Sequence, residues 1–255
     1  MSCTGSGTLW LMPNALDFGM TTSVLPDLRQ TLPLAAIEIA ARTGHWVVEN
    51  ARSARQFLKR VDAVVPLGQP LQSLHIVELP RPRKGSHAPP PGMKGLLEPA
   101  RRGSDIALLS EAGLPAVADP GAALVEAAHG LNLTVLPLAG ASSLLLALAA
   151  SGLNGQSFAF VGYLPVDAAE RALRIRELEA LSRRAGQTQL MIETPYRNPV
   201  LLDALLAQLQ PATRLSVSCG ITLASGWNRS DTVAGWRRNP HPLPADVPAV
   251  FALLA

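Results

Sequence analysis

Residues 105–121 read DIALLSEAGLPAVADPG, and this stretch decides the fold. Its first part, residues 105–109, is a short apolar run between turn-forming residues, which predicts a buried β-strand. Residues 110–121 are rich in small residues, glycine and proline, which predicts a turn leading into a helix. Ligands of α/β proteins bind at the carboxyl ends of strands, so Glu111 and its small neighbours are candidates for ligand contact. A tight strand-to-helix turn without a ligand is the alternative.

Short apolar runs alternate with helical stretches along the chain. Further strands are predicted at residues 8–12, 46–48, 74–79, 133–136, 158–161, 190–192, 215–219 and 250–254. This alternation predicts an α/β fold with mostly parallel sheets covered by helices. The turn-rich residues 151–155 (SGLNG) interrupt the pattern. We therefore expect an N-terminal α/β domain over 1–152, a C-terminal α/β domain over 153–255, and a ligand cleft between them.

The second half carries clear helix signals. Asp167 followed by Glu170 is the pattern of a helix start at which both side chains satisfy free backbone amides. Glu170 and Arg174 lie four residues apart, so we expect an ion pair between them on the exposed face. Pro195 is expected to open a helix that continues to about residue 209.

The composition excludes several classes of protein. Two cysteines are too few for a disulfide framework or a four-cysteine zinc site, and the five histidines show no metal-ligand spacing, so no metal is expected. No apolar run approaches the roughly 20 residues that span a bilayer, and no signal-peptide pattern is present. We expect a cytoplasmic protein without membrane contact. P-loop, dinucleotide-binding and nucleophile-elbow motifs are missing.

The net charge of +3 is mild, but basic residues gather between residues 81 and 102. This window holds six arginines and lysines against one acid, Glu98, among many prolines and glycines. Such a composition predicts a loop. The loop is either a solvated connector or an arm that contacts phosphate groups.

Two further turns follow predicted strands. In residues 137–143 (PLAGASS), Ser142 or Ser143 can cap the next helix, whose free amides favour polar or anionic ligand groups. A plain helix cap is the alternative. Residues 193–197 (ETPYR) form the third turn of this kind. Three such turns are consistent with one shared ligand site.

Several of these strings resemble the motifs of one family, in that family's order and over nearly the whole chain. SEAGLPAVADPG resembles S-D-A-G-T-P-x-x-x-D-P-G, FVGYLP resembles F-x-G-F-L-P, MIETPYR resembles F-Y-E-S-P-H-R, and VENAR resembles A-E-D-T-R. PLAGASSLLLALAASGL is similar to P-x-P-G-P-S-A followed by a small-residue helix. The resemblance is to the tetrapyrrole (corrin/porphyrin) methylase superfamily. Its nearest branch is the ribosomal RNA small-subunit methyltransferase I type, which methylates a ribose 2′-oxygen.

The resemblance implies a two-domain α/β fold, a homodimer, and S-adenosylmethionine bound in the cleft between the domains. It also implies that most contacts to this cofactor are made by the backbone. Carried over by position, the residues that contact the cofactor are Leu16, Glu111, Ala112, Gly113, Ala116, Ser142 and Ser143, with Ile192, Glu193, Ile221 and Ala249 from the second half.

The polar residues of several family motifs are replaced in this chain. The turn T-P-I-G-N has become residues 14–18 (NALDF), and the histidine-rich S-Y-H-E-H-N segment is not recognisable. A-E-D-T-R keeps only Glu49 and Arg52 of its charged residues, and E-S-P-H-R keeps Glu193 and Arg197 but has Tyr196 in place of histidine. The cofactor scaffold is therefore kept, while the substrate side is altered.

Methyl transfer to a ribose hydroxyl requires a base near the methyl group. Glu49 is the first candidate for this base and Glu193 the second. Each could instead form a structural ion pair, Glu49 with Arg52 and Glu193 with Arg197. The two arginines are also candidates for binding a phosphate or carboxylate of the substrate.

Three functions remain open at this point. The leading one is an S-adenosylmethionine-dependent methyltransferase that acts on RNA, with ribosomal RNA or the small ribosomal subunit as its partner. The second is a methylase of a small, tetrapyrrole-like molecule. The third is a cofactor-binding homologue with lost or changed catalysis.

Overall fold

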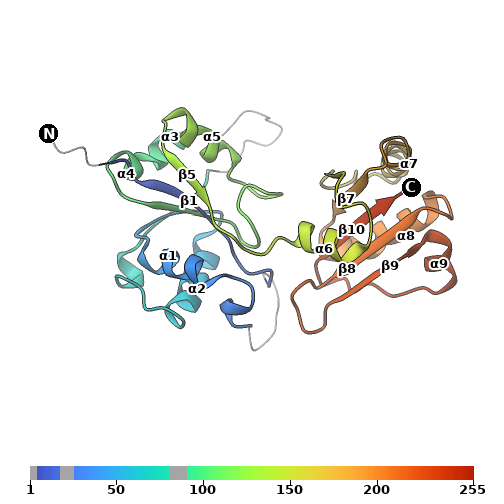
Figure 1. The fold of residues 1–255 in the computed structure, drawn as a ribbon, viewed down its shortest axis with the longest axis horizontal. Helices are drawn as coiled ribbons and strands as arrows, with labels where there is room; N and C mark the ends of the chain where they lie inside the picture. The colour runs from blue at the N-terminus through green and yellow to red at the C-terminus, as the bar shows by residue number, and fades with distance from the viewer. Residues whose placement is uncertain (1–4, 18–25, 81–90) are drawn as a thin grey trace. The chain divides into compact units, whose positions relative to one another are not determined.

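The computed structural model describes residues 5–17, 26–80 and 91–255 (Figure 1). The chain divides into two compact units, Met1–Ala141 and Ser142–Ala255. This division lies before helix α6 (Ser143–Ser151), whereas the sequence placed the boundary after it, near residue 152. The reason is that Leu144 and Leu148 of α6 pack in one cluster with Leu190 and Val250 of the second unit.

The first unit is built on a parallel sheet of five strands. These are β1 (Thr8–Met12), β2 (His45–Val48), β3 (His75–Glu78), β4 (Ile106–Leu109) and β5 (Thr134–Pro137), in the order β3-β2-β4-β1-β5. All four pairings are parallel, as the alternating pattern predicted. The central β4 is buried throughout, because helices cover both faces of a parallel sheet.

Helices pack on both faces of this sheet (Figure 1). Helices α1 (Leu34–Arg42) and α2 (Ala51–Asp62) share a core cluster with Trp46 and Ala107 of the sheet. Helices α3 (Met93–Leu96), α4 (Glu98–Arg101) and α5 (Ala122–Gly130) share another with Leu108. Short 3₁₀ turns are η1 (Leu28–Gln30) and η2 (Leu71–Ser73). The sequence missed α1, since its N-cap position is Pro33 and no side chain caps it.

The second unit is built on a mixed sheet. Its strands are β6 (Phe158–Phe160), β7 (Thr188–Ile192), β8 (Arg214–Cys219), β9 (Trp227–Thr232) and β10 (Ala249–Leu254), in the order β6-β7-β10-β8-β9. Only the pair β6 and β7 is parallel. The expectation of a mostly parallel sheet was wrong here, because the short connection from β8 to β9 allows only an antiparallel pair.

Helix α6 covers one face of this sheet, and α7 (Ala168–Ala185), α8 (Asn198–Gln208) and α9 (Val233–Arg238) cover the other (Figure 1). The Asp167 half of the predicted cap is confirmed, because Asp167 accepts hydrogen bonds from the amides of Ala169 and Glu170, whereas the return bond expected of the Glu170 side chain is not found among the described contacts. The predicted Glu170–Arg174 pair was wrong, since Arg174 pairs with Glu177 at 3.1 Å. The helix expected from Pro195 is divided into η3 (Pro195–Arg197) and α8.

The topology of the first sheet positions the residues that follow its strands. The neighbours β2, β4 and β1 run parallel, so their carboxyl ends meet at one edge. Glu49, Ser110 and Asn14 lie just beyond these ends. Within the ranges described above, no helix combines the length and the apolar character needed to cross a membrane.

Candidate functional site

Two hydrogen bonds, one from the backbone of Glu49 and one to its side chain, join Glu49 to the end of β4 and to the turn that follows. The amide of Glu49 donates to the carbonyl of Leu109 at 3.0 Å, which continues the pairing of β2 with β4 beyond the strand. The Glu49 carboxylate then accepts from the amide of Glu111 at 3.1 Å. Glu49 is half-buried and makes no ion pair with Arg52 in the described structure. The structural pairing considered for these two residues is therefore not found.

Asn14 fixes the turn after β4 from the other side. Its side-chain amide donates to the carbonyls of Ser110 and Glu111, both at 3.0 Å, and its backbone amide donates to Gly113 at 2.8 Å. Asn14 is only 6% exposed, so these bonds are made away from water. Asn14 stands where the family motif T-P-I-G-N has threonine, and its hydrogen bonds hold the turn after β4 in place.

The turn after β4 has an unusual backbone. Gly113 has φ +65°, and two non-glycine residues, Ala116 and Ala118, have φ 65° and 64°. Left-handed alanines cost about 1–2 kcal/mol each, and such strain collects at ligand sites. A Cβ at Gly113 would lie 3.4 Å from Leu16 Cδ2, so the turn and the loop after β1 are in contact. The structure thus brings together Leu16, Glu111, Ala112, Gly113 and Ala116 of the predicted set.

Three carboxylates share this edge of the sheet. Burial and the charge of Glu49 raise the pKa of Glu111, and a hydrogen bond with Ser53 lowers it in part. Burial and the charges of Glu49 and Glu111 raise the pKa of Asp119 to about 6, against a hydrogen bond with Ser110 that lowers it. A carboxyl group that titrates near neutral pH is suited to proton transfer.

Asp119→Asn should stabilise the protein at neutral pH but not at acidic pH. The pKa of Asp119 is 3.8 in its ordinary state and about 6 in the fold, so the folded state holds this proton more tightly. The free energy of unfolding therefore falls as pH rises between these values, and the whole penalty is present above about 6. Urea unfolding on either side of this window tests the prediction, and an equal gain at both pH values would contradict it.

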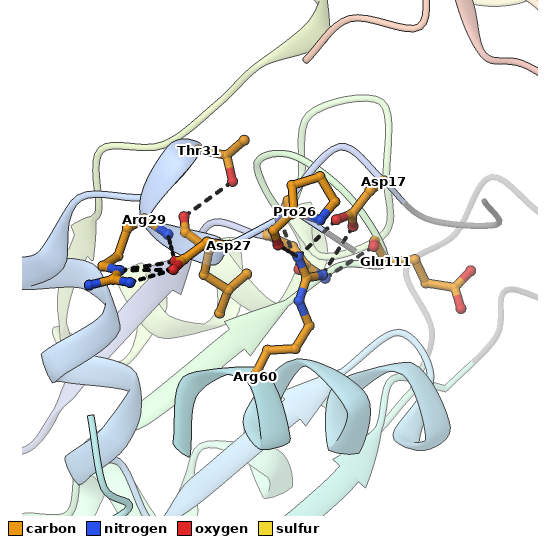
Figure 2. A network of polar contacts seen from close by, with 10 residues as sticks. Asp17, Pro26, Asp27, Arg29, Thr31, Arg60 and Glu111 are labelled. Atoms are coloured by element: carbon orange, nitrogen blue, oxygen red, sulfur yellow. Dashed lines mark hydrogen bonds and ion pairs between the residues drawn. The ribbon is translucent and has the colours of Figure 1, made fainter. Parts of the chain in front are cut away.

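Arg60 of α2 holds the two described stems of the loop between β1 and η1 (Figure 2). Its guanidinium forms a two-pronged ion pair with Asp17, at 3.1 and 2.8 Å, and donates to the carbonyl of Pro26 at 2.9 Å. The side chains of Arg60 and Asp17 are 20% and 10% exposed, so the pair is well shielded from solvent. Asp17 adjoins Leu16, and the ion pair therefore helps to place Leu16 against Gly113.

The predicted contacts from the second unit also gather at one edge of their own sheet. Ile192 ends β7, Glu193 follows it, and Ala249 begins the antiparallel neighbour β10. Ile221, just after β8, and Ile192 pack against the hydrophobic cluster that contains Leu144 of α6. Ser142 is the N-cap residue of α6, but its side chain does not cap the helix. Ser143 begins that helix.

Glu193 forms the structural ion pair that was considered for it. Its carboxylate is 3.1 Å from the Arg197 guanidinium, and its other oxygen accepts from the backbone amide of Thr194 at 2.8 Å. The Glu193 side chain is only 3% exposed. Tyr196 between them is 70% exposed. Glu193 and Arg197 thus neutralise one another, which weakens both as a base and as an anion-binding residue.

The remaining predictions about charge and metals have simpler outcomes. Residues 81–90 of the basic window lie outside the described residues. Arg101 and Arg102, at the end of that window, both pair with Glu98. For this end, the pairing favours a solvated connector over an arm that contacts phosphate groups. Arg52 is exposed in the first turn of α2. Among the residues whose positions are described, no group of three potential ligands is arranged to hold a metal ion.

Three residues of this site were not identified as site residues from the sequence. Asn14 and Arg60 form hydrogen bonds with residues far away in the sequence, and no local sequence pattern predicts such contacts. Asp119 was inside the quoted turn, and its signal was the D-P-G ending of that turn. Asp119 lies near Glu49 because β2 pairs with β4 in the sheet, and the sequence alone does not show this pairing.

Comparison with known proteins gives sequence relatives named ribosomal RNA small subunit methyltransferase I. The chain is 33% identical over 205 residues to the ribosomal RNA small subunit methyltransferase I of Micromonospora olivasterospora, covering 80% of this chain and 56% of that protein. It is 36% identical over 152 residues to that of Bacillus subtilis (58% and 51%). It is 37% identical over 194 residues to that of Vibrio cholerae (76% and 57%). The chain thus aligns with about half the length of these relatives. No family model matches the chain.

Solved structures share the fold over almost the entire chain. A uroporphyrin-III-C-methyltransferase from Thermus thermophilus superposes with a TM-score of 0.52 at 18% identity, covering 97% of this chain and 92% of that one. The methyltransferase CobJ superposes with a TM-score of 0.53 at 15% identity, covering 97% and 94%. The sequence relatives, the shared fold and the motifs of the β4 turn agree with one another, and the chain has the fold of these methyltransferases and resembles the tetrapyrrole methylase superfamily.

Proposed function

We propose that this chain is an S-adenosylmethionine-dependent methyltransferase that acts on ribosomal RNA at a ribose 2′-oxygen. The observation that carries the proposal is the turn after β4. It presents a glycine and two left-handed alanines beside Glu49 at the carboxyl edge of a parallel sheet. The relatives named as ribosomal RNA small subunit methyltransferase I support the class of substrate.

The residues of the turn fit a ligand that is bound through the backbone. Gly113 lacks a Cβ where one would lie 3.4 Å from Leu16 and 3.8 Å from the Ala141 carbonyl. A small residue here lets a ligand approach the main chain closely. Glu111 and Ala112 next to Gly113 are half-buried, so part of each residue remains accessible. The predicted contacts from the second unit stay predictions.

S-adenosylmethionine, when bound, supplies a methyl group that is already activated on a sulfonium sulfur. The task of the chain is to orient the acceptor, exclude water and take up the proton of the acceptor hydroxyl. We assign the proton to Glu49, whose carboxylate is fixed by the Glu111 amide and carries no arginine partner among the described residues. Glu193 is the weaker candidate because Arg197 already neutralises it.

Transfer of a labelled methyl group from S-adenosylmethionine to small ribosomal subunits and to free ribosomal RNA tests the function. The expected product is RNA that resists alkaline cleavage at one ribose, because a 2′-O-methyl group blocks attack on the adjacent phosphate. Label that enters a tetrapyrrole without RNA would instead establish a small-molecule methylase. Cofactor binding without transfer to any acceptor would establish a homologue with lost or changed catalysis.

Two further expectations follow from the proposed function. A ribosomal substrate would place the activity in the cytoplasm. The homodimer that the family resemblance implies is tested by light scattering during size-exclusion chromatography. A mass of twice 26.9 kDa is expected, and the mass of a single chain would contradict the dimer.

A further inference from the structure

Helix α2 is amphipathic, and its solvent face is basic. Its buried side is formed by Ala54, Phe57, Leu58 and Val61, which pack into the core of the first unit. Its exposed positions are all polar or charged, and the three cations among them are Arg52, Arg55 and Lys59. The spacings of three and four residues place these cations on one stripe of the helix.

The charges of this stripe are not neutralised within the described structure. Arg52, Arg55 and Lys59 form no ion pair with any described residue, and Arg55 donates only to the carbonyl of Ala51 at 3.2 Å. Arg60 on the same helix shows the contrast, because it turns inward and pairs with Asp17 at 2.8 Å.

Two carboxylates on or beside α2 have other roles. Asp62 is the one acid on α2, in its last turn, and it accepts from the amide of Leu67 at 2.9 Å. Glu78 at the end of β3 accepts from the amide of Ala51 at 2.8 Å and so caps the first turn of α2. Neither carboxylate is paired with a cation of the stripe.

The stripe begins at the proposed site. Asn50 caps α2 by accepting from the amides of Arg52 and Ser53, and it directly follows Glu49. Arg52, in the first turn of α2, is therefore three residues along the chain from the proposed base. From Arg52 to Lys59 the helix rises by about 10 Å. The three cations are spread over this length and start close to the proposed base. They can therefore contact successive phosphates of one RNA strand.

We propose that the α2 stripe (Arg52, Arg55 and Lys59) binds the phosphate backbone of RNA and leads the strand to Glu49. This inference rests on the proposed function, whose substrate it locates. The two arginines can hold phosphates through two parallel hydrogen bonds, and the lysine adds a point charge. An anionic membrane is disfavoured, because a helix that binds lipid turns its apolar face outward, and the apolar face of α2 is buried.

The test is the salt dependence of RNA binding, measured by fluorescence anisotropy with labelled single-stranded RNA and with deproteinised small-subunit ribosomal RNA. The variant is Arg55→Gln/Lys59→Gln. The control is Arg183→Gln/Arg184→Gln, which removes the same charge from exposed positions at the end of α7. Each lost phosphate contact lowers the slope of log affinity against log salt by about one. We expect this slope to be smaller by about two in the variant and unchanged in the control.

Equal slopes in the variant, the control and the unchanged protein would overturn the proposal. Loss of binding to anionic phospholipid vesicles with no change in RNA binding would also overturn it and point to a membrane. Calorimetric titration with S-adenosylmethionine separates this inference from the proposed function. The variant should bind the cofactor as the unchanged protein does, whereas failure of the unchanged protein to bind it would contradict the proposed function alone.

Discussion

Glu49→Gln should lower the rate of methyl transfer by about two to four orders of magnitude, the usual contribution of a general base. Glutamine keeps the shape of the side chain, and its carbonyl can still accept from the Glu111 amide as the carboxylate does at 3.1 Å. The turn after β4 should therefore keep its conformation. The affinity for S-adenosylmethionine should change little, because only the proton acceptor is lost.

Two further measurements test the role of Glu49 as the base. Since the charge of Glu49 raises the pKa of both Glu111 and Asp119, the variant should lower the pKa of Asp119 from about 6, as measured by NMR titration. Glu193→Gln is the matched control in the second unit, where the carboxylate is already paired with Arg197. An unchanged turnover in Glu49→Gln, together with a large loss in Glu193→Gln, would transfer the role of base to Glu193.

Gly113→Arg should abolish binding of S-adenosylmethionine while leaving the protein folded. The new side chain would start from a position where a Cβ lies 3.4 Å from Leu16, and its further atoms would have to extend over the turn at which we propose that the ligand binds. Because an arginine at φ +65° is strained, the free energy of unfolding should fall by about 1–2 kcal/mol. Calorimetric titration gives the affinity, and thermal unfolding gives the stability.

Gly152→Arg is the matched control for Gly113→Arg. Gly152 also has φ +65°, at the end of α6, but a Cβ there would meet no heavy atom within 4 Å. The two variants therefore carry the same backbone strain and differ in what the side chain meets. Equal cofactor affinity in both variants would contradict the placement of the ligand at Gly113. Gly113→Ala, with strain but little bulk, should lie between them.

The sequence predicted the fold best where local pattern and tertiary environment agree. The first sheet is such a case, because short apolar runs followed by turn residues are what a strand buried on both faces requires. Strand β9 was missed, since its residues WNRSDT are mostly polar and it lies at an edge, where solvent can reach it. The mixed order of the second sheet was missed for a related reason. Strand direction depends on the connections rather than on the composition of each strand.

The candidate site was predictable to the extent that it is local. Glu111, Ala112 and Gly113 are adjacent in one turn, and the position of that turn after a strand indicated their role. Glu49 lies 62 residues from its partner Glu111, and Arg60 lies 43 residues from Asp17. These contacts depend on the order of the strands and on the face that a helix turns inward. The pKa of Asp119 is likewise a property of charges brought together by the sheet.

Calorimetric titration of the folded protein with S-adenosylmethionine and with its demethylated product is the decisive measurement. We expect saturable binding of one molecule per chain for both compounds, and its loss in Gly113→Arg. A folded protein that binds neither compound would contradict the proposed cofactor site. The turn after β4 would then be a structural connection between strand and helix, and the resemblance to the superfamily would describe ancestry alone.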